Sequence, residues 1–193
     1  VTITNANNVT ADFGFAAQSI TQSAGSGATT FSGAVDTNAA GGIDLNGQAF
    51  AFQSTVTTTS GGPVSITNGG LLTIAGAADM SLDGAFTQDG AGSVQTAGDI
   101  TTTGDTVSFA APVSLTGAVA IDTTSGSPGG ATITFGNTLD GTQALSLNAG
   151  TGGNIDFDAA VGTTRLGAVT ITNANNVTAD FGFAAQSITQ SAG

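Results

Sequence analysis

Apolar residues in this chain recur at every second position rather than at every third or fourth. Segments such as VSIT (64–67), VSLT (113–116) and TITF (132–135) alternate one apolar residue with Thr or Ser. This alternation places the apolar side chains on one face of an extended strand and the small polar groups on the other. The other strand-like pieces are VTIT (1–4), GIDLN (42–46), FAFQ (50–53), LLTIA (71–75), VAID (119–122), LSLN (145–148) and NIDFD (154–158). Since no segment carries helical spacing, we expect an all-β protein.

A longer period is marked by phenylalanine followed four residues later by Val or Leu. Spacings between the marked phenylalanines predict coils of roughly 21–24 residues, which is typical of solenoids. One such coil is too short to bury its own apolar face, but stacked coils can do so. The variable coil length favours a right-handed parallel β-helix, with all phenylalanines expected inside. The pairs are Phe31/Val35, Phe52/Val56, Phe109/Val113, Phe135/Leu139 and Phe157/Val161.

Residues 1–25 and 169–193 are identical at every position, an offset of 168 residues. We therefore expect a window on a tandem array, with 1–168 as one full unit of a continuous solenoid of about 7–8 coils and 169–193 as the start of the next unit. Neither end is expected to be a cap, and the backbone is expected to continue from Gly193 into another copy. One screw operation along the rod axis should superpose the two copies.

Composition narrows the function classes. The thirteen acidic residues are all Asp and face one cation, Arg165, for a net charge of −12. One arginine cannot neutralise a row of phosphates, so no nucleic-acid partner is expected. No apolar run reaches the length of a membrane span. Because His, Cys, Lys, Tyr and Glu are absent, the usual proton-transfer groups and nucleophiles are missing, and we expect no enzyme.

The remaining candidate for catalysis is a pair of carboxylates, Asp156 and Asp158, on one side of a strand. We interpret them as solvated outward residues beside Phe157, and we assign no catalytic, cofactor-binding or metal-binding residue. The segment GGNIDFD (152–158) has the oxygen ligands that calcium prefers, but no calcium-binding repeat is present. No cofactor is expected beyond weak, diffuse calcium binding by surface Asp.

Three further patterns have structural interpretations. The threonine strips VTTTS (56–60) and ITTTGDT (100–106) are interpreted as outward strand residues, Thr58 among them, because an ice-binding surface would need the same step in every coil. The sequon NVT permits glycosylation at Asn8 and Asn176 only where the source has that machinery. Asparagines that follow strands are expected to form turns and hydrogen-bonded ladders between coils. They are Asn5, Asn46, Asn68, Asn148 and Asn173.

The VTIT, VSIT and VSLT strand openings, the FxxxV steps and GGNIDFDAAVGTTRLGAVTI (152–171) resemble the repeat regions of secreted adhesins of the filamentous haemagglutinin type. They are also similar to autotransporter passenger domains. The resemblance implies a bacterial, exported right-handed β-helix at the cell surface. The identical copies depart from the degenerate repeats of that family.

Two functions remain open. The first is a structural repeat of a long extracellular fibre or adhesin stalk, giving mechanical reach or surface coating. Its partner would be the chain itself, coil on coil along the fibre and laterally between fibres. The second is an adhesive module that recognises a host or surface glycan, which would need exposed aromatic or charged residues on one loop.

Overall fold

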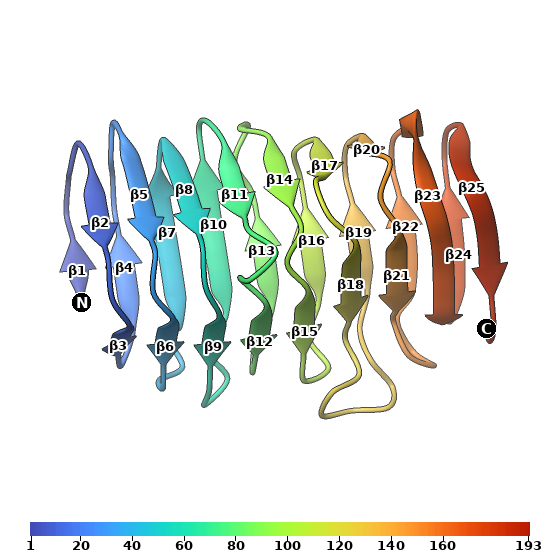
Figure 1. Ribbon diagram of the computed structural model, residues 1–193. Coiled ribbons are helices and arrows are strands. Elements are labelled where there is room, and N and C mark those ends of the chain that lie inside the picture. Colours follow the sequence, from blue (N-terminus) through green and yellow to red (C-terminus); the bar gives the residue numbers. More distant parts are fainter.

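The computed structural model describes residues 1–193 as a β-helix of about nine turns (Figure 1). It contains 25 β-strands and no helix, and hence none long and apolar enough to cross a bilayer. Each coil contributes one strand to each of three faces, and every neighbouring pair of strands is parallel. In Figure 1 the chain rises on the far side, crosses the top toward the viewer and descends on the near side as it advances toward the C-terminus, which makes the coil right-handed. The predicted fold is confirmed.

Face I is the nine-stranded sheet, with one strand from each coil. Its strands are β1 (Thr2–Ile3), β4 (Ile20–Gln22), β7 (Ile43–Gly47), β10 (Val64–Asn68), β13 (Phe86–Gln88), β16 (Val107–Phe109), β19 (Ile133–Phe135), β22 (Asn154–Phe157) and β24 (Asn176–Ala179).

Faces II and III belong to one sheet that is continuous through β23 (Val161–Asn173). Face II holds β2 (Val9–Ala11), β5 (Ala28–Phe31), β8 (Ala49–Phe52), β11 (Leu72–Ile74), β14 (Val94–Thr96), β17 (Val113–Leu115), β20 (Leu139–Asp140) and the first residues of β23 and β25 (Phe183–Gln190). Face III holds β3 (Phe15–Ala17), β6 (Val35–Thr37), β9 (Val56–Thr58), β12 (Met80–Leu82), β15 (Ile100–Thr102), β18 (Val119–Asp122), β21 (Leu145–Asn148) and the last residues of β23 and β25.

The core is a continuous apolar column along the axis. Each strand follows the predicted alternation, as in β10, where Val64 and Ile66 are fully buried and Ser65 between them points outward. Val64 lies in register with Ile43 of the preceding coil and Phe86 of the following one. Thirty-seven buried residues join in one cluster that runs from Ile20 to Ala174, so no break divides the chain into separate domains.

Phenylalanine rings stack directly between coils at two corners of the coil. At the corner after face II, the rings of Phe31 and Phe52 are stacked with centroids 5.2 Å apart. At the corner after face I, Phe109, Phe135 and Phe157 form a stacked column with centroid separations of 5.5 and 5.4 Å. Such offset stacks add to the hydrophobic energy of burial.

Two expectations about individual side chains are wrong. Phe13 and Phe181 are 84% and 63% exposed, because each lies in a corner between strands, where the backbone turns and the alternation of inward and outward residues is interrupted. Thr58 is only 3% exposed. It ends β9 with the same parity as the buried Val56, so the strand points its side chain inward.

The two identical segments keep the same stacking register but lie on different faces. In the first copy, Thr2 pairs with Thr21 on face I. In the second, the equivalent Thr170 pairs with Thr189, but both belong to the sheet of faces II and III. The pairing register between adjacent coils is therefore repeated, but the position on the coil is not. The strand bounds also differ, because residues 15–22 form β3 and β4 on two faces, whereas their equivalents form the single strand β25.

Replacing Phe135 should be severe. Phe135→Ala leaves a cavity in the middle of the stacked column and is expected to cost about 3–5 kcal/mol. Phe135→Asp should cost more, because it places an unpaired charge in an apolar column. The matched control is Thr134→Ser on the outward face of β19, which should leave the thermal melting temperature unchanged. Equal melting of all three variants would contradict the assigned interior.

Candidate functional surfaces

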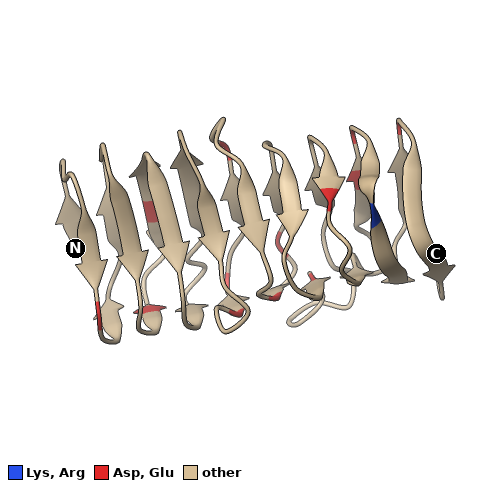
Figure 2. Ribbon diagram, turned by 45° about the horizontal axis from the view of Figure 1, so that its top comes forward, with Lys and Arg blue, Asp and Glu red and all other residues tan.

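The acidic residues are spread over the rod rather than gathered at one place. Figure 2 shows them scattered along strands and corners, with the single cation, Arg165, near the C-terminal end. No group of three or more carboxylates is close enough to hold a metal ion. Arg165 makes no ion pair, and its guanidinium donates a hydrogen bond to the carbonyl oxygen of Ala185 at 3.0 Å.

Asp156 and Asp158 lie at the end of face I. Asp156 points outward from β22 and stacks in register between Thr134 and Thr178. Asp158 is exposed in the following corner, where its backbone N–H donates to the carbonyl of Phe135. Neither carboxylate accepts a hydrogen bond from another side chain, and no pocket includes them. Both side chains therefore lie on the outer surface of the rod, outside its hollows.

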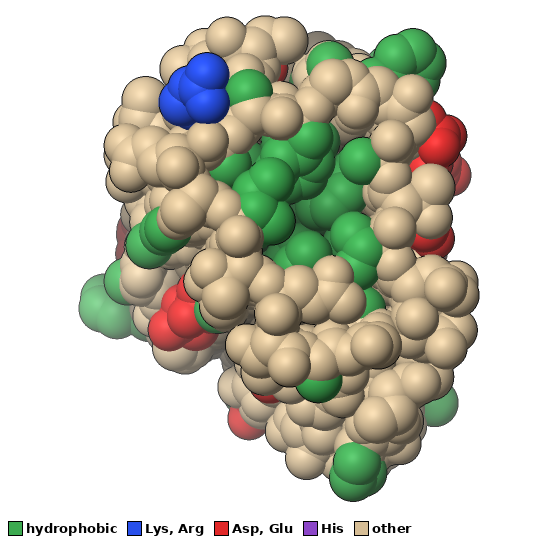
Figure 3. Space-filling model, turned by 90° about the vertical axis from the view of Figure 1, so that its right-hand side faces the viewer, with side chains coloured by type: hydrophobic (Ala, Val, Ile, Leu, Met, Phe, Trp, Pro, Cys, Tyr) green, Lys and Arg blue, Asp and Glu red, His purple; other side chains and the backbone are tan.

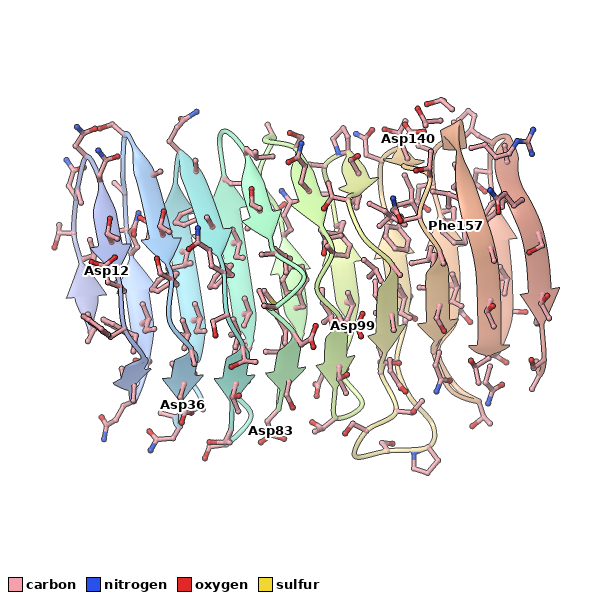
Figure 4. All side chains as sticks on the ribbon, in the orientation of Figure 1. Asp12, Asp36, Asp83, Asp99, Asp140 and Phe157 are labelled. Atoms are coloured by element: carbon pink, nitrogen blue, oxygen red, sulfur yellow. The ribbon has the colours of Figure 1, made fainter.

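Several other aspartates bridge one coil to the next. The Asp99 carboxylate accepts the backbone N–H of Ala120 at 2.7 Å, and Asp140 accepts the N–H of Thr164 at 2.7 Å. Figure 4 shows the labelled aspartates lying on different edges of the rod, whereas Phe157 points into its interior. These carboxylates accept backbone N–H groups of β18 and β23 from the following coil, and they thereby join one coil to the next.

Asp83 makes the most developed of these bridges. Its carboxylate accepts the N–H of Gly61 at 2.8 Å and the hydroxyl of Thr103 at 3.0 Å, from the coils on either side. The hydrogen bond from Gly61 has the larger effect and the one from Thr103 the smaller, and together they hold the pKa of Asp83 below its ordinary value of 3.8. Its own backbone N–H donates to the Thr58 hydroxyl at 3.1 Å. Buried Thr58 is thus an acceptor at this corner, which explains why it is not an outward residue.

The threonine strips divide between the interior and the surface. Thr58 and Thr102 are buried at the ends of their strands, whereas Thr57 and Thr101 point outward. The outward row of face III reads Asp36, Thr57, Ser81, Thr101 and Asp122 in successive coils. This row contains no regular threonine array. The interpretation of the strips as outward residues is correct for Thr57 and Thr101 and wrong for Thr58 and Thr102.

The asparagines act at corners and do not form one ladder. Asn68 is fully buried, donates to the carbonyl oxygen of Gly92 at 3.0 Å and accepts from the Gln88 amide at 2.8 Å. Asn148 stands in register with Asn173, but its amide donates to Asp122 and Thr124 of the preceding coil. The asparagines Asn5 and Asn46 are exposed, as are Asn8 and Asn176 of the two sequons.

The most unusual surface residues are Phe13 and its repeat, Phe181. Each is the first phenylalanine of an FGF step, and the second, Phe15 or Phe183, turns toward the core cluster. The hollows on the surface are shallow. The one over β18, β21 and β23 has a volume of about 280 Å³, lined mainly by small residues between Asp99 and Thr170. Neither Phe13 nor Phe181 lines any of these hollows.

Comparison of the chain with models of protein families, with curated proteins and with solved structures finds no match in any of the three.

The Asp83 bridge predicts a pH dependence. Because the pKa is lowered on folding, the carboxylate stabilises the folded state fully above 3.8, and this contribution is lost as pH falls through the lower pKa of the folded chain. Asp83→Asn should therefore melt below the wild type at neutral pH, and the difference should narrow in acid. Asp44→Asn, on an exposed residue without side-chain hydrogen bonds, is the control and should melt as the wild type does. A difference between Asp83→Asn and wild type that stays constant into acid would show that the charge is not its source.

Proposed function

We propose that this chain is a structural repeat of a long extracellular fibre or adhesin stalk on a bacterial surface, giving mechanical reach or surface coating. The observation that carries the proposal is the identity of residues 1–25 and 169–193, combined with the same coil-to-coil register in both copies. A unit whose coils stack in the same register at each recurrence extends a rod.

The C-terminal coil exposes part of the apolar interior of the rod. Figure 3 views this end and shows hydrophobic side chains filling the middle of a ring of other atoms. Ile188 is 57% exposed there, whereas its register partner Val169, one coil inward, is buried. A further coil would cover these side chains and pair the open strand edges of β24 and β25.

The arrangement of the aspartates is compatible with a structural role in a fibre. The aspartates are used between coils or point to solvent, and the charge of −12 keeps neighbouring rods soluble and apart unless a specific lateral contact overcomes the repulsion. The proposal therefore includes no catalysis and no cofactor. Its partner is the chain itself along the fibre.

The alternative is an adhesive module that binds a host or surface glycan. The exposed rings of Phe13 and Phe181 favour it, because exposed aromatic side chains provide flat apolar contact area. A glycan array that retains the wild-type chain but not the Phe13→Ser/Phe181→Ser double variant would establish this alternative.

Chains of one, two and three 168-residue units test the fibre directly. At about 4.8 Å per coil, each unit should lengthen the rod by roughly 37 Å without widening it, as measured by electron microscopy. The control is the same series with Phe135→Asp in every unit, which should form no regular rod. Compact particles, or a length that does not increase with the number of units, would contradict the proposal.

A further inference from the structure

The repeat unit does not close on a whole number of coils. Thr2–Ile3 lie on face I of the first coil. Their equivalents, Thr170 and Ile171, pair with Ser146 and Leu147 of β21 on face III of the eighth coil. The offset is seven full coils and two further faces, so 168 residues are one face short of eight coils.

The rest of the second copy has the same displacement. Val9–Ala11 form β2 on face II, and their equivalents Val177–Ala179 lie in β24 on face I, paired with β22. Phe15 begins β3 on face III, and Phe183 begins β25 on face II, in register with Val161. The whole segment has moved back by one face without a change in its internal register.

We propose that successive units of the fibre turn by one face, about a third of a turn, so that three units carry each surface feature around all three sides. The inference rests on the tandem array proposed above. The rotation of each unit then follows from the geometry, because the same 168-residue offset recurs at every junction between units. Phe13 and Phe181 already show it, since Phe13 lies in the corner between faces II and III and Phe181 in the corner between faces I and II.

The aromatic columns give a physical reason for this rotation. Within the unit, stacked rings occur after face II in the early coils, at Phe31 and Phe52, but after face I in the late coils, ending at Phe157. Phe183 packs edge-on against Phe157 with centroids 5.2 Å apart. Its equivalent Phe15 packs edge-on against Phe31 at 6.1 Å.

If the next unit is turned by one face, its Phe31–Phe52 stack lies in line with the stack that ends at Phe157. Ala179 lies in register above Phe157, and its equivalent Ala11 lies in register below Phe31. The Phe31 and Phe52 of the next unit therefore continue the column that ends at Phe157, with Phe183 bridging the step. An unrotated unit would place those two rings above the corner after face II, where Leu115 and Gly141 lie one over the other, and the aromatic stack would be interrupted.

The rotation has a consequence for contacts between fibres. A residue that occurs once per unit, such as the exposed Phe13, would point in three different directions in three successive units. It would not form a row along one side of the rod. Lateral contacts through such a residue would join a fibre to neighbours around its axis and would favour a bundle over a flat sheet.

Cysteine pairs test the rotation within the 193-residue chain, which has no cysteine of its own. Neighbouring strands are about 4.8 Å apart, within the Cα range of a disulfide. The outward pairs Ser146→Cys/Thr170→Cys and Asp156→Cys/Thr178→Cys stand in register and should each form an intramolecular bond on oxidation. Asp156→Cys/Thr170→Cys is the discriminating pair, since Thr2 and Asp156 belong to the same outward row of face I. We expect no disulfide between these two cysteines. An unrotated unit would place them in register on face I, so a disulfide formed by this pair would overturn the inference.

A second measurement uses chains extended by whole units. Gold labels on Ser125→Cys, in the exposed corner after β18, should point to a different side of the rod in each of three successive units and return to the first side in the fourth. Labels on one side of a regular rod would overturn the rotation and leave the fibre intact, whereas the absence of a rod would overturn the proposed function itself.

Discussion

The structure depends on the in-register stacking of each coil on the one before it. Each strand obtains its backbone hydrogen bonds from the coils on either side, and each inward side chain packs on its equivalents, as Val64 does on Ile43 and Phe86. No coil can bury its apolar face alone. The register therefore brings into contact residues that are about one coil apart in the sequence.

The corners between faces need additional interactions, because the ladders of hydrogen bonds do not extend through them. The ladders satisfy N–H and C=O groups in the strands, but the turns between faces must find other partners. Asp83, Thr58 and Asn68 supply them, each across to a neighbouring coil. Gly42 is required for another reason, because it has φ +52° and a Cβ there would overlap the carbonyl oxygen of Pro63. Polar side chains at the corners thus join one coil to the next.

A repeat that is one face short of a whole number of coils separates two properties that are usually linked in solenoids. The apolar interior continues through every coil, whereas in the proposed array each surface feature returns to the same side only after three units. Uniform stacking along the axis can then coexist with features distributed around it. The phenylalanine columns are consistent with the proposed step, because the stack changes corner within the unit by the same one face.

The sequence by itself determined the parallel β-helix, its coil length and most of its interior. Period-two alternation and the recurrence of phenylalanine are direct consequences of stacking identical strands. Only the tertiary structure decided what happens at corners. Phe13 and Thr58 were misplaced because corner geometry interrupts or extends the alternation in ways that local pattern does not specify, and the aspartates found their partners in other coils. The face occupied by the second copy is also a tertiary property, since it depends on the summed lengths of all strands and corners between Val1 and Val169.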